Sequence, residues 1–145
     1  MKELRTEVII DAPTEKVWNI LMDHPSYGEW NPFIEKISGS MEVGKNLEVT
    51  IHPPNQKPMN FKPVILKNDA GKEFRWKGKL FFKGLFDGEH YFQLSSVNGT
   101  QTKLVHGEKF TGILVGILLK MIGKNTLLGF KEMNSALKIR SEQTV

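Results

Sequence analysis

The sequence contains no cysteine among its 145 residues. This absence excludes disulfide frameworks, zinc ribbons, thiol catalysis and iron–sulfur clusters. A long apolar run is also missing, because the longest one, 113–119, is far short of the roughly 20 residues that cross a bilayer. Residues 1–5 lack the apolar core of a signal peptide. We therefore expect a cytoplasmic protein without a transmembrane segment.

Charge of one sign is not strongly in excess either. Lys and Arg number 20 against 16 Asp and Glu, which gives a formal net charge of +4. The basic residues Arg75, Lys77, Lys79 and Lys83 fall on one face of a predicted strand. No outward aromatic side chains alternate with them, so this face is typical of a solvated surface and not of a nucleic-acid track. We expect no nucleic-acid partner.

The segment Gly39–Asn46 approaches the phosphate-binding loop motif but does not complete it. Asn46 stands where the motif needs a Ser or Thr to ligate magnesium. The next residues, 47–51, alternate like a strand, whereas the motif needs a helix there. The segment is therefore predicted to be a hairpin loop.

Hydrophobic periodicity divides the chain into strands and two helices. Turn signals rich in glycine, proline and asparagine separate short alternating runs, which favours antiparallel neighbours. The strands are predicted over 4–10, 33–38, 46–52, 59–67, 73–82, 88–97 and 101–110, and the helices over 13–23 and 113–141. The fold class is α+β, with a curved seven-stranded antiparallel sheet wrapped round a long C-terminal helix, and a short helix after the first strand. We expect a single domain over 1–145, with a proline-containing edge or bulge at Pro63.

The hairpin between 88 and 110 has a register that the inward and outward pattern selects. A three-residue loop at 98–100 pairs Leu94 with Leu104, whereas a two-residue turn would pair Leu94 with Lys103. The longer loop also places His90 opposite Glu108 on the inner face. We therefore predict a hydrogen bond between these two side chains.

Polar groups on this inner face are the main candidates for chemistry. His90, His106 and Glu108 share the inward parity, whereas His24 and His52 lie outside it and are predicted to be solvated. Three roles stay open: a structural hydrogen bond between buried groups, a contact that orients a ligand oxygen, and a general acid–base pair. A structural bond is favoured over either functional role taken alone. One carboxylate is too few for a metal site, so we expect no metal.

Aromatic residues are predicted to line the inner face, and one helix cannot fill a wide curved sheet. A partly open cavity is therefore expected, although inward aromatics are also common in an ordinary core. The candidate apolar wall consists of Trp30, Phe61, Trp76, Phe92 and Phe110. Leu85 and Phe86, flanked by Gly84 and Gly88, are predicted to form a mobile lid or a tip that touches a membrane; the competing interpretation is a loop that packs back on the sheet.

Several segments resemble the helix-grip superfamily, which includes START-type lipid-transfer domains, polyketide cyclase/dehydrases and the birch pollen allergen. The resemblance is carried by Ala12–Trp18, Tyr27–Phe33, Phe74–Gly78, Gly88–Phe92 and His106–Gly112, and it covers essentially the whole chain. The later segments are similar to an uncharacterised bacterial branch. Fold does not fix function in this superfamily.

The resemblance implies a cavity for a small hydrophobic ligand, such as a lipid, an isoprenoid or a polyketide-like compound. The ligand-binding candidates are Trp30, Phe61, Trp76, His90, Phe92, His106, Glu108 and Phe110, with Leu85 and Phe86 as the lid. One alternative is a cyclase or dehydratase that uses His90, His106 and Glu108 for proton transfer. Another is a co-chaperone-like interaction module. We expect binding without a cofactor; transient membrane contact and the oligomeric state stay open.

Overall fold

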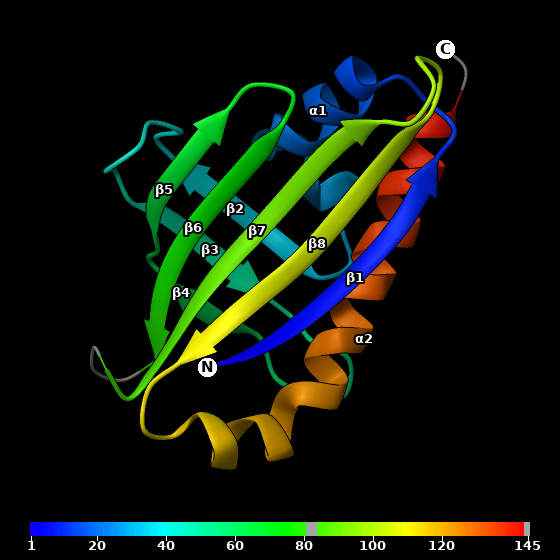
Figure 1. Ribbon diagram of the computed structural model, residues 1–145. Helices are drawn as coiled ribbons and strands as arrows, with labels where there is room; N and C mark the ends of the chain where they lie inside the picture. Colours follow the sequence, from blue (N-terminus) through cyan, green and yellow to red (C-terminus); the bar gives the residue numbers. More distant parts are fainter. Residues whose placement is uncertain (81–83, 144–145) are drawn as a thin grey trace.

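The computed structural model describes residues 1–80 and 84–143, and within these it contains eight strands, two α-helices and one 3-10 helix (Figure 1). In chain order these are β1 (Lys2–Ile10), α1 (Thr14–Met22), η1 (His24–Glu29), β2 (Ile34–Gly39), β3 (Leu47–Ile51), β4 (Met59–Phe61), β5 (Val64–Asp69), β6 (Glu73–Leu80), β7 (Phe86–Ser96), β8 (Thr102–Thr111) and α2 (Val115–Glu142). All paired strands are antiparallel. The predicted α+β class with a long C-terminal helix is confirmed.

The strand count differs from the predicted seven, because the run 59–67 forms two strands instead of one. β4 pairs with β3 in a three-stranded sheet of order β2-β3-β4, while β5 pairs with β6 in a five-stranded sheet of order β1-β8-β7-β6-β5. The chain changes sheet at Pro63, which has no backbone N–H for a ladder. Its carbonyl still accepts a hydrogen bond from the Leu47 N–H at 2.9 Å, which holds the two sheets together at this corner.

The hairpin of β7 and β8 has the predicted register. His90 is opposite Glu108, and Leu94 is opposite Leu104. Gly99, in the loop between the two strands, has a φ of +83°, which glycine adopts without steric cost. The predicted strand over 73–82 corresponds to β6, and its last positions, Phe81 and Phe82, lie outside the described residues. The segment Gly39–Asn46 connects β2 to β3, as predicted for a hairpin loop.

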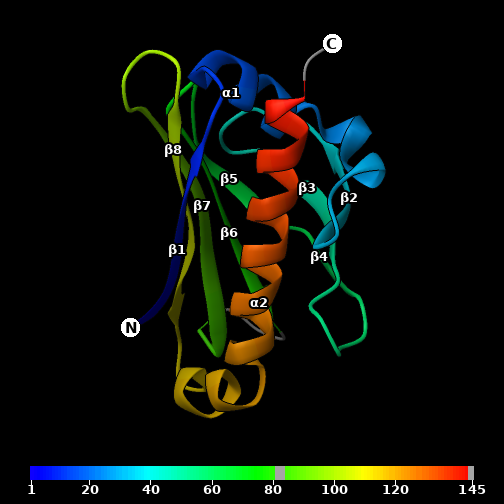
Figure 2. The same ribbon diagram turned by 90° about the vertical axis from the view of Figure 1, so that its right-hand side faces the viewer.

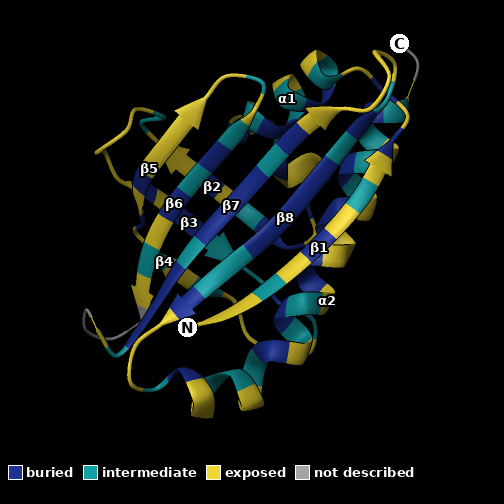
Figure 3. Ribbon diagram, in the orientation of Figure 1, coloured by how far each residue is buried: buried dark blue, intermediate teal, exposed yellow. Residues whose placement is uncertain are grey.

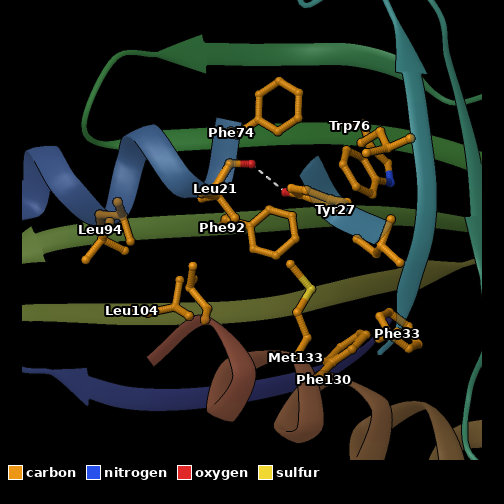
Figure 4. Close-up of a cluster of buried hydrophobic side chains, with 14 of the residues drawn as sticks. Leu21, Tyr27, Phe33, Phe74, Trp76, Phe92, Leu94, Leu104, Phe130 and Met133 are labelled. Atoms are coloured by element: carbon orange, nitrogen blue, oxygen red, sulfur yellow. Dashed lines mark hydrogen bonds between the residues drawn. The ribbon is translucent and has the colours of Figure 1, made fainter. Parts of the chain in front are cut away.

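The prediction that His24 is solvated is wrong. The segment after α1 forms the short helix η1, which turns the His24 ring inward, where it lies 5.2 Å from the Tyr27 ring and 5.7 Å from the Phe74 ring. The Tyr27 hydroxyl donates to the Leu21 carbonyl and fixes η1 against α1 (Figure 4). Burial is the cause that lowers the pKa of His24 to about 4. His52 is partly exposed and pairs with Glu35.

The two sheets and α2 enclose the interior, with α2 lying along the opening between the sheets (Figure 2). Near α1 the interior is a continuous apolar core, drawn in Figure 4, and we call this region the packed end. Its central side chains are Leu21, Phe74, Phe92, Leu94, Leu104, Phe130, Met133 and Leu137.

At the opposite end, a separate small cluster consists of Phe86, Phe110 and Val115. We call this region the cavity end. Here the first turns of α2 lie beyond the end of the large sheet, at an angle to the rest of the helix (Figure 1). Much of their surface is exposed (Figure 3). None of the helices among the described residues is long and apolar enough to cross a membrane.

Candidate functional site

A cavity of about 80 Å³ lies at the cavity end, between α2 and the two sheets. Apolar side chains form most of its wall, and polar residues from β6, β7, β8 and α2 also line it. Its lining residues are Phe33, Val49, Ile51, Met59, Phe61, Pro63, Trp76, Gly78, Lys79, Phe86, Gly88, His90, Glu108, Phe110, Ile122 and Thr126. The structure therefore contains the space that was expected between sheet and helix.

Some of the predicted wall residues line this cavity, and others do not. The predicted residues in the lining are Phe61, Trp76, His90, Glu108, Phe110 and Phe86. Phe92 instead belongs to the packed core, and the fully buried His106 lies behind His90. Trp30 packs on the edge of Tyr27, and Leu85 lies in the turn before β7.

Apart from Phe61, sequence reasoning missed the wall supplied by the small sheet. Val49 and Ile51 alternate on β3, and Met59 precedes Phe61 with the same parity on β4. This period of two was a usable signal. It was not used because 59–67 was interpreted as one ambiguous strand. Thr126 and Ile122 on α2 had no comparable signal, since the apolar pattern there does not distinguish one face from another.

A chain of hydrogen bonds links the cavity to the core beneath it. Thr6 Oγ1 donates to the His106 carbonyl at 2.7 Å and accepts from Asn134 Nδ2 at 2.7 Å. The amide oxygen of Asn134 therefore faces His106 Nδ1, 2.8 Å away, and the ring donates to it. This assignment follows from the network, since only one arrangement gives every contact a donor and an acceptor.

The network also fixes the protons at the cavity. Burial, with a smaller contribution from the neighbouring His90, lowers the pKa of His106 well below 6.5, so its ring is neutral. His106 Nε2 then has no proton and accepts from His90 Nε2, 2.8 Å away. His90 Nδ1 in turn faces Glu108 Oε1 at 3.3 Å. Two bare acceptors would repel each other there, so one proton lies between this nitrogen and this oxygen.

Two neighbours hold the His90–Glu108 pair in place. The Trp76 ring stacks on the His90 ring with centroids 4.9 Å apart and an interplanar angle of 16°. The Glu108 side chain lies over Gly88, where a Cβ would stand 2.0 Å from Oε2. Glycine at this position therefore makes the room that the carboxyl group occupies. Glu108 keeps 18% of its side-chain surface exposed, whereas His90 keeps 5%.

The predicted lid segment is bonded to the start of α2. The carbonyls of Gly84 and Leu85 accept hydrogen bonds from Ile113 and Leu114 at 3.2 and 2.9 Å. Phe86 stacks on Phe110 with centroids 5.2 Å apart. The segment and the first turns of α2 therefore form one unit, and its mobility stays a prediction.

The remaining candidates do not form a second site. Arg75 on the outer face pairs with Glu73 at 2.7 Å and with Glu89 at 2.6 Å, and it lies over the Tyr91 ring. Of the basic stripe, which was predicted to be a solvated face, Arg75 keeps 16% of its side-chain surface exposed and Lys79 lines the cavity. Lys83 lies outside the described residues. Within the described ranges, no cluster of three or more metal-ligating side chains occurs.

Comparisons with known proteins point in one direction. The sequence model of the family described as polyketide cyclase / dehydrase and lipid transport matches residues 1–139. Among solved structures, the Zhui aromatase/cyclase from a Streptomyces species is similar with a TM-score of 0.77 and 14% identity, over 97% of this chain and 93% of that one. A START superfamily protein from Mycobacterium smegmatis is similar with a TM-score of 0.73 and 18% identity, over 97% of each chain.

A protein from Chromobacterium violaceum is similar as well, with a TM-score of 0.75 and 17% identity over 98% of each chain. At these identities the structural likeness establishes the fold alone. No curated protein sequence matches this chain.

Proposed function

The chain belongs to the polyketide cyclase/dehydrase and lipid transport family, and from this premise we propose that it binds a small hydrophobic molecule carrying a hydroxyl group. The observation that supports the proposal is a proton-sharing His90–Glu108 pair in the wall of an otherwise mostly apolar cavity. Burial of an apolar ligand surface would drive binding, at roughly 25 cal/mol per Å². The polar pair would orient the ligand.

The hydroxyl follows from the direction of the hydrogen bonds. Both ring nitrogens of His90 are engaged, by Glu108 and by His106. The shared proton lies between His90 Nδ1 and Glu108 Oε1, whether the pair is imidazolium and carboxylate or neutral imidazole and carboxylic acid. Oε2 is therefore an acceptor in both states, and it makes no hydrogen bond to another described residue. A ligand that reaches it must supply a donor, as an alcohol or phenol does.

The size of the cavity requires that the protein opens on binding. Pockets for small molecules usually measure roughly 300–1,000 Å³, whereas this cavity measures about 80 Å³. Two wall residues, Phe86 and Phe110, belong with Val115 to a small cluster that is separate from the main core. Movement of the first turns of α2 away from the large sheet would enlarge the cavity without disturbing the packed end.

A matched pair of probes tests this proposal. We expect 2-naphthol to bind at least about fivefold more tightly than 2-methoxynaphthalene, because the methyl ether leaves the acceptor Oε2 buried without a donor. The difference should vanish in Glu108→Leu and persist in the control Glu35→Leu, which removes a partly exposed carboxylate outside the cavity. Isothermal titration measures both affinities. Equal affinities for the two probes, or no binding of either, would contradict the proposal.

Native mass spectrometry of freshly purified protein provides an independent check. A small molecule retained from the cell should appear as a mass increment in the native chain. The increment should decrease in Glu108→Leu and should carry an exchangeable hydroxyl or N–H proton. A retained molecule without any hydrogen-bond donor would contradict the hydroxyl requirement, and would leave only the apolar wall as the source of affinity.

A second candidate function is proton transfer to a bound ketone, and the shared proton of the His90–Glu108 pair is the observation that favours it. Glu108 Oε2 would remove a proton from a carbon next to the carbonyl to give an enolate. The proton on the pair would exchange with solvent, and the pair would then deliver a solvent-derived proton to the same carbon. Deuterium exchange at the α-carbons of 2-tetralone in D₂O, followed by NMR, measures this step. Acceleration that is lost in Glu108→Gln supports an enzyme; exchange at the buffer rate supports a carrier.

A further inference from the structure

The first turns of α2 and the turn just before them expose large apolar side chains to solvent. Ile113, Ile117 and Met121 are 79%, 64% and 70% exposed. Ile117 and Met121 are four residues apart and therefore lie on one side of α2, and Ile113 lies in the turn just before the helix. We call these three residues the apolar stripe. The opposite side, with Val115, already packs in the small cluster of the cavity end. The stripe is therefore an exposed apolar surface, separate from the side of α2 that packs against the protein.

The exposed charged residues on the same turns, Lys120 and Lys124, have one sign. Neither forms a salt bridge to any residue that the structure describes. The sequence has no acidic residue between Glu108 and Glu132. Apolar side chains flanked by lysines, without carboxylates, match the surface of a membrane that contains anionic lipids, where apolar groups enter the acyl boundary and cations contact the headgroups.

The position of the stripe fits a flat partner. Figures 1 and 2 show that these turns project at one end of the molecule, beyond the large sheet. We propose that the protein docks on anionic membranes through the apolar stripe, with Lys120 and Lys124 against the lipid headgroups. This inference goes beyond ligand binding and does not depend on it. Because Ile122 lines the cavity from the same turns, docking would bring the cavity next to the bilayer.

A second copy of this chain fits the stripe less well. In a symmetric dimer the same patch faces itself, so Lys120 and Lys124 would approach their own copies. Stable interfaces also bury about 800 Å² on each partner, and three side chains at the start of α2 and in the turn before it supply only part of that area. An anionic membrane removes both difficulties, since its charge is opposite and its surface adapts to a narrow stripe.

Sedimentation with lipid vesicles tests the proposal. We expect the protein to bind vesicles of phosphatidylcholine mixed with phosphatidylglycerol, and to bind at least about tenfold more weakly to phosphatidylcholine alone. The double variant Ile117→Ser with Met121→Ser should lose binding by a similar factor. Its matched control is Ile139→Ser, since Ile139 is also 64% exposed but lies near the far end of α2. Lys120→Gln with Lys124→Gln should weaken vesicle binding and make it less dependent on salt concentration. The control Lys131→Gln should change neither.

Each result decides the question. Failure of the native chain to sediment, or unchanged sedimentation of the Ser variants, would overturn the proposal. Self-association in analytical ultracentrifugation that is lost in the same variants would assign the stripe to a second copy instead. If the Ser variants misfold, Ile117→Trp replaces them: its fluorescence should shift to the blue with the mixed vesicles, and an unchanged spectrum overturns the proposal. Unchanged 2-naphthol binding by the variants separates this result from the proposed ligand site.

Discussion

The packed end and the cavity end of the interior lie under the same strands and against the same helix, yet they are built differently. At the packed end, Phe130, Met133 and Leu137 of α2 are essentially inaccessible to solvent. The Phe130 ring lies 5.5 Å from Phe33 and 4.3 Å from His106. At the cavity end, the same helix exposes apolar side chains and leaves a cavity of about 80 Å³ beside a small cluster.

This difference separates stability from function along one helix. Regions with few buried apolar contacts open locally at lower free energy than the core does. We therefore expect the first turns of α2 to move without unfolding the sheet, while the packed end keeps the hairpin of β7 and β8 in register. The proposed ligand site therefore lies where we expect opening to be least costly.

The largest expected effect is a core truncation at the packed end. Phe130→Ala removes a fully buried ring and should lower the free energy of unfolding by about 3–5 kcal/mol. Ile122→Ala, in the half-buried wall of the cavity end, should cost about 1 kcal/mol or less, because the space beside it is already present. Urea denaturation measures both. Similar losses for the two variants would contradict the difference between the ends.

Acid should destabilise the packed end through its buried histidines. Burial lowers the pKa of His24 to about 4 from an ordinary 6.5, and it lowers the pKa of His106 as well. Below pH 6.5 the unfolded chain therefore binds protons that the folded chain does not, so stability falls as the pH falls toward 4. For His24 alone the loss at pH 5 is about 2 kcal/mol.

Urea midpoints at pH 7 and pH 5 measure this loss. His24→Phe should remove a part of the decrease in stability, because phenylalanine at this position binds no proton when the chain unfolds. His52→Phe is the matched control, since His52 is partly exposed. A decrease of the same size in His24→Phe and in the native chain would show that His24 does not contribute.

Gly88→Ala should alter the cavity more than the fold. The added Cβ would stand 2.0 Å from Glu108 Oε2, which lies near the end of a flexible side chain and can move aside. We expect a loss of about 1 kcal/mol or less in stability. The preference for 2-naphthol over 2-methoxynaphthalene should disappear, because Oε2 no longer faces the ligand. A retained preference would show that Glu108 does not supply the acceptor.

The smallest expected effect comes from Gly116→Ala in the first turn of α2. A Cβ there meets no atom within 4 Å, and alanine favours a helix over glycine by roughly 0.8–1.0 kcal/mol. Amide hydrogen exchange should slow in the first turns of α2, with almost no change at the packed end. Equal slowing at both ends would mean that they open together, as one unit.

The sequence supports the fold and the hairpin register, because both depend on patterns that neighbouring residues display. The alternation of β7 and β8 selects the pairing of His90 with Glu108 without any knowledge of the third dimension. Pro63 was recognised as an irregularity, but its effect was not, since a change of sheet depends on which strand lies nearby. The burial of His24 depends on η1 in the same way.

The hydrogen-bond network beneath the cavity could not be predicted. It joins Thr6 of β1, His106 of β8 and Asn134 of α2, which are far apart in the sequence. No local pattern distinguishes Asn134 from other polar residues of an amphipathic helix. Of the candidate wall, Phe92 and Phe110 share one parity, yet only Phe110 reaches the cavity. Parity identifies the inner face of a strand but does not show where along the strand the packing ends.

The central claim is that the cavity end admits a hydrophobic ligand while the packed end stays closed. Amide NMR spectra of the chain titrated with 2-naphthol test this claim most directly. We predict chemical-shift changes in β4, in the part of β6 near Trp76, at Gly88 and His90, at Glu108 and Phe110, and in the first turns of α2. Amides near Leu21, Leu94 and Leu104 should remain unchanged. Shifts concentrated at the packed end, or no shifts at a saturating probe concentration, would contradict the account.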